Sequence, residues 1–370
     1  MRRRRVLFTA AGLSGVAALA VLVGLVRGDC AAGQSSGESQ GSEATASAAT
    51  SAFLDRYVRS NGRVSRIDQG GDTVSEGQAY AMLLAAAQRR SRVFAKVWTW
   101  TREHLRRPDG LLSWHWEHGR VVASDSAADG DLDAAWALLL GSERLGVPAY
   151  RTEALELAHA ILEHETVSLD GRSLLVAGNW ATTFPAVVDP SYFTPRAFAA
   201  LGRASGDPRW GQLESTSHQV LRELTARPTG LAPDWAVVEP NGEAKPTPAP
   251  GQGGEATFGY DAVRVPLWQA QSCAGRNASI AGRMEPFFYE KVASSPSSIY
   301  SLEGEPRSGP PGAPMLVAAA AASFGAGDGA AAANWLDGAE ADVEAEPTYY
   351  GMALLALARS SFERKGGLRC

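Results

Sequence analysis

The stretch SEGQAYAMLLAAAQRR, residues 75–90, places a carboxylate, a glycine and a tyrosine at the head of an apolar run with helical period. Two further stretches repeat this arrangement, namely ADGDLD at residues 128–133, which is followed by AAWALLL, and FGYDAVR at residues 258–264. Apolar residues spaced in this way indicate helices with buried faces. Three acidic motifs at the heads of such helices predict a fold that gathers carboxyl groups from distant parts of the chain.

Segments of helical period recur from residue 52 to residue 362, separated by Gly, Pro and Asp. Alternation typical of strands is confined to short pieces such as 120–123 and 174–176. The fold class is therefore predicted to be all-α. The predicted helices are 52–59, 76–90, 92–106, 132–145, 149–163, 191–203, 209–224, 260–274, 280–292, 313–323, 330–336 and 348–362.

The predicted helices alternate in character along the chain. Some begin with acidic or aromatic residues and continue with Ala, Met and Leu, whereas the intervening ones carry more charge, as at 102–104 and 153–159. Inner helices surrounded by outer helices would produce this alternation. The number and order of segments fit a toroid of six helical hairpins with the chemistry at one rim, and the Pro- and Gly-rich stretch 240–254 is then a surface loop.

The amino-terminal residues predict export. Four arginines at positions 2–5 precede an apolar run at 6–26, which is long enough to cross a bilayer, so residues 1–29 are predicted to be a signal peptide or an N-terminal membrane anchor. Residues 30–50 have the composition of a low-complexity linker. A globular catalytic domain is expected at 51–362 and a C-terminal tail at 363–370. The protein is expected to be secreted, periplasmic or held at the cell envelope.

Composition excludes several classes of function. The formal net charge is −5 and no basic stripe is present, so nucleic acid is not an expected partner. There is no phosphate-binding or dinucleotide-binding motif and no metal-ligand spacing of histidines, so neither a cofactor nor a metal is expected. The three cysteines do not form a disulfide framework, and Cys273, in an apolar helical pattern, is expected to be a buried thiol.

Glu76 follows Ser75, a good N-cap, and should lie in the first turn of a helix. A carboxylate there is often only a partner of the helix dipole. The alternative is a general acid, favoured by Gly77, which leaves room for a ligand, and by the apolar helix that follows. A helix start lowers the pKa of a carboxyl, so burial beside a second carboxylate such as Asp129 would have to raise it.

The second and third motifs also have two interpretations. Asp129, Asp131 and Asp133 do not fit a calcium loop, because Ala134 stands where glycine is needed. At least one of them should face a polar cleft, and Asp129 is favoured, with Asp133 as a helix cap. Asp261 can form an ion pair with Arg264 within one helix, or serve as a base that the arginine keeps ionised.

Aromatic residues near these motifs are candidate platforms for sugar rings, although about half should be packing residues. Trp114 and Trp116 would point to one side of an extended segment. The other candidates are Trp136, Trp180, Tyr192, Trp235, Tyr260, Tyr349 and Tyr350.

These motifs resemble glycoside hydrolase family 8. The likeness is carried by SEGQ-x-Y-x-M at 75–82, ADGD at 128–131 and YDA-x-RV at 260–265, and extends to DPSY at 189–192, PDW at 233–235 and the tyrosines at 349 and 350. It covers most of residues 53–362 and is greatest to periplasmic endoglucanases associated with bacterial cellulose synthesis. The family has an (α/α)6 barrel and cleaves β-1,4-glucans with inversion.

The resemblance implies catalytic roles. The general acid falls on Glu76, the base on Asp261, and the aspartate that engages the distorted sugar on Asp129; inversion implies roughly 6.5–9.5 Å between acid and base. It implies a β-glucan as substrate and the cellulose synthesis or export machinery as a partner. Ala128 and Ala134 depart from the family pattern, which affects packing around the motif more than its acids. The expected substrate-binding residues are Tyr80, Trp114, Trp116, Asp131, Trp136, Tyr192, Trp235, Tyr260, Arg264 and Tyr349.

The expected function is an exported inverting endo-β-1,4-glucanase. One alternative keeps the same machinery but acts on chitosan, xylan or mixed-linkage β-glucan. Another is a non-catalytic glucan-binding accessory protein of polysaccharide export, for which a lost catalytic acid would be the mark, whereas all three acids are present. A structural helical solenoid is disfavoured because no residue signature repeats from one helix pair to the next.

Overall fold

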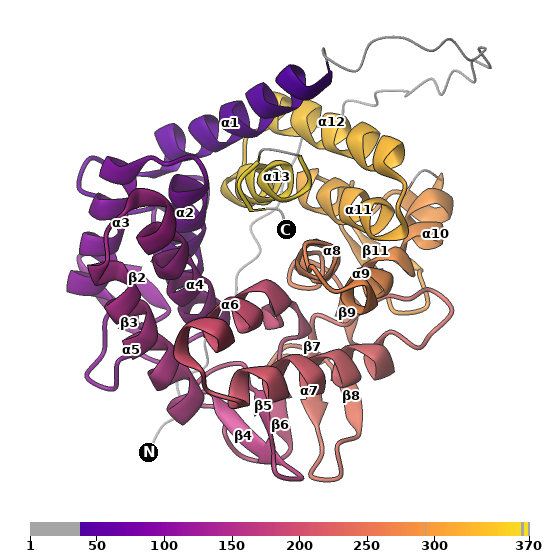
Figure 1. Ribbon diagram of the computed structural model, residues 1–370. Helices are drawn as coiled ribbons and strands as arrows, with labels where there is room; N and C mark the ends of the chain where they lie inside the picture. Colours follow the sequence, from indigo (N-terminus) through magenta and orange to yellow (C-terminus); the bar gives the residue numbers. More distant parts are fainter. Residues whose placement is uncertain (1–37, 293, 364–365, 369–370) are drawn as a thin grey trace.

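The structure is a computed structural model that describes residues 38–292, 294–363 and 366–368. Within these residues, six helices form an inner ring (Figure 1). Each contacts the next along the chain, and the last contacts the first, so the ring is closed. The inner helices are α2 (Ser75–Ala87), α4 (Ala128–Leu145), α6 (Pro195–Ser205), α8 (Arg264–Ala270), α11 (Ala313–Ala326) and α13 (Tyr349–Phe362).

A second layer of helices covers the ring, and each outer helix packs mainly on one inner helix, except α9, which packs on both α8 and α11. The layers differ in burial, as the alternation in the sequence predicted. Every residue of α2 except Glu76 is buried, whereas α3 buries only one face. The outer helices are α1 (Glu38–Tyr57) on α13, α3 (Ser91–His104) on α2, α5 (Ala149–His164) on α4, α7 (Arg209–Leu224) on α6, α9 (Gly275–Gly282) on α8 and α12 (Gly329–Ala345) on α11.

The two rims of the ring differ in their connections. Links from an inner helix to the next outer helix are short, whereas most links from an outer to an inner helix are long and contain the strands. The long links therefore gather where the inner helices begin. They contain β1 (Thr73–Val74), β2 (His115–Glu117), β3 (Arg120–Ala123), β4 (Thr166–Leu169), β5 (Arg172–Leu175), β6 (Ala186–Val188), the short helix η1 (Pro190–Tyr192), β7 (Trp235–Val238), β8 (Ala244–Thr247), β9 (Thr257–Phe258), α10 (Glu285–Phe287), η2 (Phe288–Val292), β10 (Ile299–Ser301) and β11 (Pro306–Ser308).

The strands form four small antiparallel sheets, ordered β1-β2-β3, β4-β5, β6-β7-β8 and β11-β10-β9. Thr73 pairs with Trp116, which fixes the tryptophan segment beside the head of α2. The heads of α2 and α4 also touch. A Cβ on Gly130 would lie 2.2 Å from Ser75 Oγ, so only glycine lets the first turns of these helices come this close.

Most predicted helices agree with the structure to within a turn, and 209–224 and the strand 120–123 are confirmed to the residue. Four predictions were wrong in detail. The helix predicted at 330–336 continues to Ala345, and the one predicted at 52–59 is the end of α1, which begins at Glu38. Residues 260–263 form a turn, so the helix predicted at 260–274 begins at Arg264 and ends at Ala270. The segment predicted at 280–292 is divided among the end of α9, α10 and η2. The stretch 240–254 includes β8, paired with β7.

The linker predicted at 30–50 was wrong for residues 38–50, which belong to α1; residues 30–37 and the predicted signal or anchor lie outside the described residues. Ala46 and Thr50 are buried, and Glu363 accepts hydrogen bonds from Thr45 Oγ1 (2.7 Å) and Ala46 N (3.0 Å). Small residues do not prevent packing here, because alanine favours helices and α13 supplies the apolar surface.

The predicted tail at 363–370 was also wrong where the structure describes it. Leu368 is fully buried, and its N–H donates to Ser360 O (2.9 Å), so the chain folds back onto α13. Cys273 is exposed and disulfide-bonded, so the prediction of a buried thiol was wrong as well. It lies after α8 has ended, beyond the apolar pattern on which the prediction rested.

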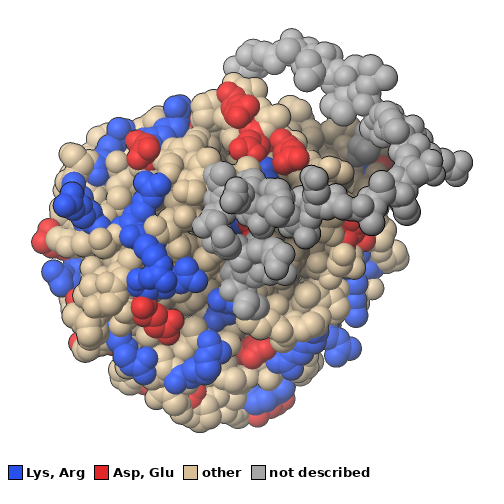
Figure 2. Space-filling model, turned by 45° about the horizontal axis from the view of Figure 1, so that its top comes forward, with Lys and Arg blue, Asp and Glu red and all other residues tan. Residues whose placement is uncertain are grey.

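The described residues include no helix with the length and hydropathy needed to span a bilayer. Figure 2 shows Lys and Arg side chains mainly on the left and lower parts of one face, with Asp and Glu between them.

The docking of α1 can be tested with a matched pair of substitutions. Ala46→Asp places a charge in a buried position beside Glu363 and should lower the free energy of unfolding by about 3 kcal/mol. Ala48→Asp, at an exposed position of the same helix, should change it by less than about 1 kcal/mol. Urea unfolding followed by circular dichroism gives both values. Equally small effects would show that this segment does not dock in solution.

Candidate active site

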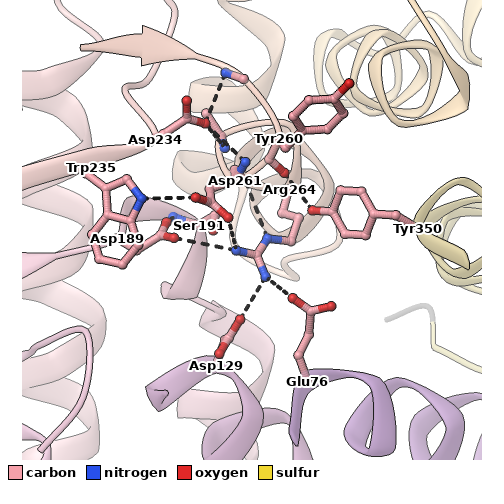
Figure 3. A network of polar contacts seen from close by, with 12 residues as sticks. Glu76, Asp129, Asp189, Ser191, Asp234, Trp235, Tyr260, Asp261, Arg264 and Tyr350 are labelled. Atoms are coloured by element: carbon pink, nitrogen blue, oxygen red, sulfur yellow. Dashed lines mark hydrogen bonds and ion pairs between the residues drawn. The ribbon is translucent and has the colours of Figure 1, made fainter. Parts of the chain in front are cut away.

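The guanidinium of Arg264 lies at the centre of four carboxyl groups (Figure 3). Its Nη1 donates to Glu76 Oε2 at 2.8 Å and to Asp129 Oδ2 at 2.7 Å. Its Nη2 donates to Asp261 Oδ1 at 3.2 Å and to Asp189 Oδ2 at 3.5 Å. The structure therefore brings together the three acids singled out in the sequence, and adds a fourth. We call these five residues the Arg264 cluster.

The cluster forms where inner helices begin. Glu76 and Asp129 are the second residues of α2 and α4, Asp261 lies in the turn before α8, and Asp189 immediately precedes η1. Unpaired N–H groups and the positive end of the helix dipole favour anions at these positions. The N-cap of α2 is Val74 and not the predicted Ser75, which is the first helical residue.

One positive charge faces four carboxyls, so the cluster favours bound protons. Burial raises the pKa of Glu76 to about 7, and Asp129 adds to this, although Arg264 opposes it. At this helix start, burial and Asp129 thus act on the pKa of Glu76 in the direction opposite to that of the helix dipole. Burial and Asp261 raise the pKa of Asp189 well above its ordinary value. Burial also raises the pKa of Asp261, against the opposing effects of Arg264 and of a hydrogen bond from Trp235.

The members of the cluster differ in access to solvent. The Arg264 side chain is 2% exposed, whereas those of Glu76 and Asp261 are 19% and 38% exposed. The two carboxyls with most access are thus held by one buried cation. Asp261 pairs with Arg264 as predicted, but from the preceding turn and not from within the helix. Arg264, expected to bind substrate, instead holds the carboxyls in place.

Aromatic side chains border this accessible edge. Tyr192 lies against the guanidinium, 5.3 Å from its ring centroid to the Arg264 carbon, and packs edge-on against Trp235. Trp235 Nε1 donates to Asp261 Oδ2 at 3.0 Å, and its ring lies beside that of Trp180, which is largely exposed. Tyr260 is the most exposed of the large hydrophobic residues in the described chain. These aromatics surround the part of the cluster that solvent reaches.

Two predicted substrate-binding tyrosines are buried instead. Tyr80 lies within 3.4 Å of Arg264 Nη1 and packs near Trp268, and Tyr349 OH lies 3.4 Å from Glu76 Oε1. Both tyrosines contact the Arg264 cluster from its buried side. The space expected beside Gly77 is occupied by Tyr349, whose hydroxyl would lie 2.5 Å from a Cβ at that position. The glycine therefore accommodates a tyrosine and not a ligand.

Asp131 and Asp133 also differ from their predicted roles. Asp131 is fully buried, and its Oδ1 accepts a hydrogen bond from Leu112 N at 2.8 Å. Burial and Glu165 raise its pKa well above the ordinary value. Asp131 and Glu165 thus form a buried pair of acids that holds the loop before α4 in place. Asp133 is buried inside α4 and is not a cap.

Trp136 was predicted to bind substrate but is buried two turns into α4. It lines a pocket of about 160 Å³ that none of the Arg264 cluster lines; the pocket is bounded by Trp136, Leu139, Leu140, Glu143, Arg151, Arg196, Ala200, Arg203 and Ala204. The apolar period showed that Trp136 lies on a helix, but not how far it lies from the rim.

The predicted tryptophan pair divides between two roles. Trp116 is half-buried, packs edge-on against Trp100, and has the Arg63 guanidinium 4.9 Å from its ring centroid. It is a packing residue. Trp114 is half-buried beside the head of α2, where its carbonyl accepts a hydrogen bond from Ser75 N at 3.0 Å. Trp114 is therefore a candidate contact at the rim.

Two site residues received no role in the sequence analysis. Asp189 completes the cluster, and Asp234 binds the turn that carries Asp261. Tyr350, a candidate sugar platform, donates from its OH to Tyr260 O at 2.7 Å. The sequence analysis quoted the motifs that contain these aspartates, but the hydrophobic periodicity of a sequence does not distinguish a functional aspartate in a loop from a turn residue. Among the described residues, no group of three or more His, Cys, Asp or Glu side chains is arranged to hold a metal ion.

Comparisons with known proteins find similar sequences and structures. Residues 38–360 match the family described as glycosyl hydrolases family 8. A probable endoglucanase from Novacetimonas hansenii is 30% identical over 222 residues, 58% of this chain and 64% of that protein. An endoglucanase from Xanthomonas axonopodis pv. citri is 30% identical over 243 residues, 61% of this chain and 60% of that protein. The matched region thus spans less than two thirds of these relatives.

A solved structure supports the fold. The β-1,3-1,4-glucanase from Paenibacillus sp. X4 superimposes with a TM-score of 0.78 at 20% sequence identity, covering 89% of this chain and 93% of that chain. A likeness at this level of identity shows a shared fold.

The raised pKa of Glu76 predicts a pH-dependent effect on stability. A carboxyl with a higher pKa in the folded state stabilises the fold below its ordinary pKa, and this contribution is lost as pH rises through about 7. Compared with the wild type, Glu76→Gln should therefore gain about 3 kcal/mol of stability between pH 4 and pH 8.5. Urea unfolding at both pH values measures the difference. Glu303→Gln, at a 72% exposed side chain, should follow the wild type; parallel curves for Glu76→Gln would contradict the raised pKa.

Proposed function

The chain belongs to glycosyl hydrolases family 8, and we propose that it is an inverting endo-β-1,4-glucanase. The observation that carries this proposal is the placement of Glu76 and Asp261 on one guanidinium, at an edge that solvent reaches. Hydrolysis of a glycosidic bond needs two carboxyls, one to protonate the leaving oxygen and one to activate water. The names of the relatives support a glucan as the substrate.

Glu76 is the proposed general acid. A general acid must hold its proton at the working pH, and burial beside Asp129 raises the pKa of Glu76 to about 7. Tyr349 OH and Arg264 Nη1 contact different oxygens of the carboxyl, which fixes its orientation. The proton passes from Glu76 to the glycosidic oxygen as the bond from that oxygen to the anomeric carbon breaks.

Asp261 is the proposed general base. Hydrogen bonds from Trp235 Nε1 and Arg264 Nη2 favour its ionised form, and the side chain keeps access to water. A water molecule held by Asp261 attacks the anomeric carbon from the face opposite the leaving oxygen and gives its proton to the carboxylate. The products are two shorter chains, with Glu76 ionised and Asp261 protonated before exchange with solvent.

The separation of the two carboxyls is compatible with inversion. Their nearest oxygens lie 2.8 and 3.2 Å from different terminal nitrogens of Arg264. Those nitrogens are about 2.3 Å apart in a planar guanidinium, so the two oxygens are at most about 8 Å apart. This upper bound allows the roughly 6.5–9.5 Å of inverting enzymes, which leaves room for one water, and also the roughly 5–5.5 Å of retaining enzymes, so the stereochemistry of the product decides between them.

Asp129 and Tyr192 are proposed to engage the sugar beside the scissile bond, and Trp235, Trp180 and Tyr260 to bind neighbouring sugar rings along the rim. A closed ring of inner helices covered by outer helices, with the chemistry at one rim, fits an (α/α)6 barrel, which we propose as the fold. We further propose export through residues 1–29, with 6–26 retained as an anchor or removed, and action near cellulose synthesis or export machinery. The run of basic and apolar residues at 2–26 supports this location.

The two catalytic roles predict large and separable losses. Glu76→Gln and Asp261→Asn keep the shape of each side chain but remove the acid or base, and each should lower kcat on carboxymethylcellulose by at least about 1,000-fold. Reducing-sugar release measures the rate, and circular dichroism checks the fold. Glu303→Gln serves as the control and should keep full activity. Turnover near that of the wild type in either variant would refute the role of that residue.

The stereochemistry gives an independent prediction. If Asp261 activates water directly, the first product from a soluble β-1,4-glucan oligosaccharide carries the α-anomer, and mutarotation then restores the mixture. Proton NMR during the first minutes of reaction measures this ratio. A β-anomer formed first would contradict the proposed base. Activity on chitosan, xylan or mixed-linkage glucan with none on β-1,4-glucan would retain the chemistry but replace the substrate.

A further inference from the structure

The turn that carries Asp261 is held by two consecutive residues of a different segment. Asp234 and Trp235 lie at the start of β7, and Asp234 N donates to Thr257 O at 2.7 Å, which joins the two segments. Trp235 then contacts the Asp261 side chain, as described above. Asp234 contacts the backbone of the turn that carries Asp261 (Figure 3). The side chain and the backbone of Asp261 are thus both held by the dipeptide Asp234–Trp235.

Asp234 makes an unusually complete set of contacts. Its Oδ1 accepts hydrogen bonds from the backbone N–H groups of Gly259 (3.0 Å), Asp261 (3.1 Å) and Ala262 (2.8 Å). Its Oδ2 accepts one from Thr257 Oγ1 at 2.9 Å. Backbone N–H groups that converge on one carboxylate form an anion-binding nest, and hydrogen bonds to a charged group are stronger than neutral ones. The carboxylate therefore sets the shape of residues 257–262.

Gly259 provides the second sign that this contact is built into the turn. A Cβ at this position would lie 2.7 Å from Asp234 Oδ2, so a larger residue would push the carboxylate away from the backbone. Glycine is thus required for the approach of Asp234, although its φ is not in the left-handed region. The carbonyl groups of this segment have other partners, because Tyr350 OH donates to Tyr260 O and the backbone N–H groups of Val263 and Arg264 donate to Gly259 O and Asp261 O. The N–H groups of residues 259, 261 and 262 precede the helix ladder of α8, and Asp234 is the acceptor that they share.

We propose that Asp234 is a positioning residue that holds Asp261 at the distance from Arg264 that base catalysis requires. The inference rests on the proposed role of Asp261 as the base. Asp234 does not touch the reacting atoms in this scheme. It acts through the turn, by fixing the backbone from which the Asp261 side chain projects between Trp235 and Arg264.

Asp234 also influences Asp261 through its charge. Burial and, after it, the neighbouring Asp261 raise the pKa of Asp234 to about 6. Repulsion between two carboxylates acts on both, so the Asp234 charge also disfavours the ionised form of Asp261. Removing the Asp234 charge makes Asp261 easier to ionise. The acidic limb of the kcat profile, which reports ionisation of the base, should then move to lower pH. A residue with only a structural role would not move this limb.

The experiment compares two variants. Asp234→Ala removes every contact and should lower kcat on a soluble β-1,4-glucan oligosaccharide by about 100-fold, with KM changed less than about threefold. Asp234→Asn keeps a neutral acceptor of similar shape, so it should lose about tenfold or less in kcat and should shift the acidic limb to lower pH. Partial retention of activity by the asparagine variant is the rescue expected of a positioning residue.

Asp328→Ala is the matched control. Asp328 Oδ1 accepts a hydrogen bond from Ala331 N at 2.9 Å and caps α12 at the rim with short connections. Its loss should lower the Tm by a few degrees with kcat unchanged. Unchanged kcat in Asp234→Ala, or loss of kcat in Asp234→Asn with an unshifted pH profile, would overturn the proposal.

Failure of the proposed function gives a different result. If the wild type hydrolyses no β-glucan, that function fails, and amide hydrogen exchange at 259–262 decides the inference on its own. Faster exchange there in both Asp234 variants but not in Asp328→Ala supports Asp234 as the residue that holds the turn. Unchanged exchange overturns it. Should Asp234→Ala fail to fold, Asp234→Asn carries both measurements.

Discussion

The structure depends on one buried guanidinium that is shared by four carboxyl groups. Arg264 is nearly inaccessible to water, and its partners come from the heads of α2 and α4, the segment before η1 and the turn before α8. Removing the cation would leave several buried carboxyls without compensation, a strongly unfavourable state. The same contact that closes the ring of helices at this rim therefore also fixes the relative positions of the acids.

The four carboxyls share Arg264 as a partner but differ in their burial and in their other hydrogen bonds. Four acids around one cation cannot all be ionised at low cost, so protons remain where burial is greatest and charge compensation is weakest. Glu76 keeps access to the rim but lies beside Asp129, which raises its pKa to about 7. Asp261 has a further donor in Trp235 and more exposure. An acid and a base can thus arise from the same cluster.

Much of this arrangement could be predicted from residue spacing. The helical period places α2 and α4, and an acid at the head of each must lie at the same rim if the inner helices run parallel. Period alone does not show depth, which is why Tyr80, Tyr349 and Trp136 were assigned to substrate although they pack inside. Nor does composition show docking, because the small residues of α1 look like a linker until α13 covers them.

The proposed acid and base are anchored in different ways, and this difference explains the contacts around them. Glu76 projects from a helix whose own hydrogen bonds fix its backbone, so its neighbours need only orient the side chain. Asp261 projects from a turn whose carbonyl groups accept hydrogen bonds from the start of α8, but whose N–H groups precede the helix ladder. Its backbone is fixed from outside, by the Asp234 carboxylate and the close approach that Gly259 permits. A base on a turn can be adjusted to the water it must hold, but only if another residue supplies the rigidity that a helix would have provided.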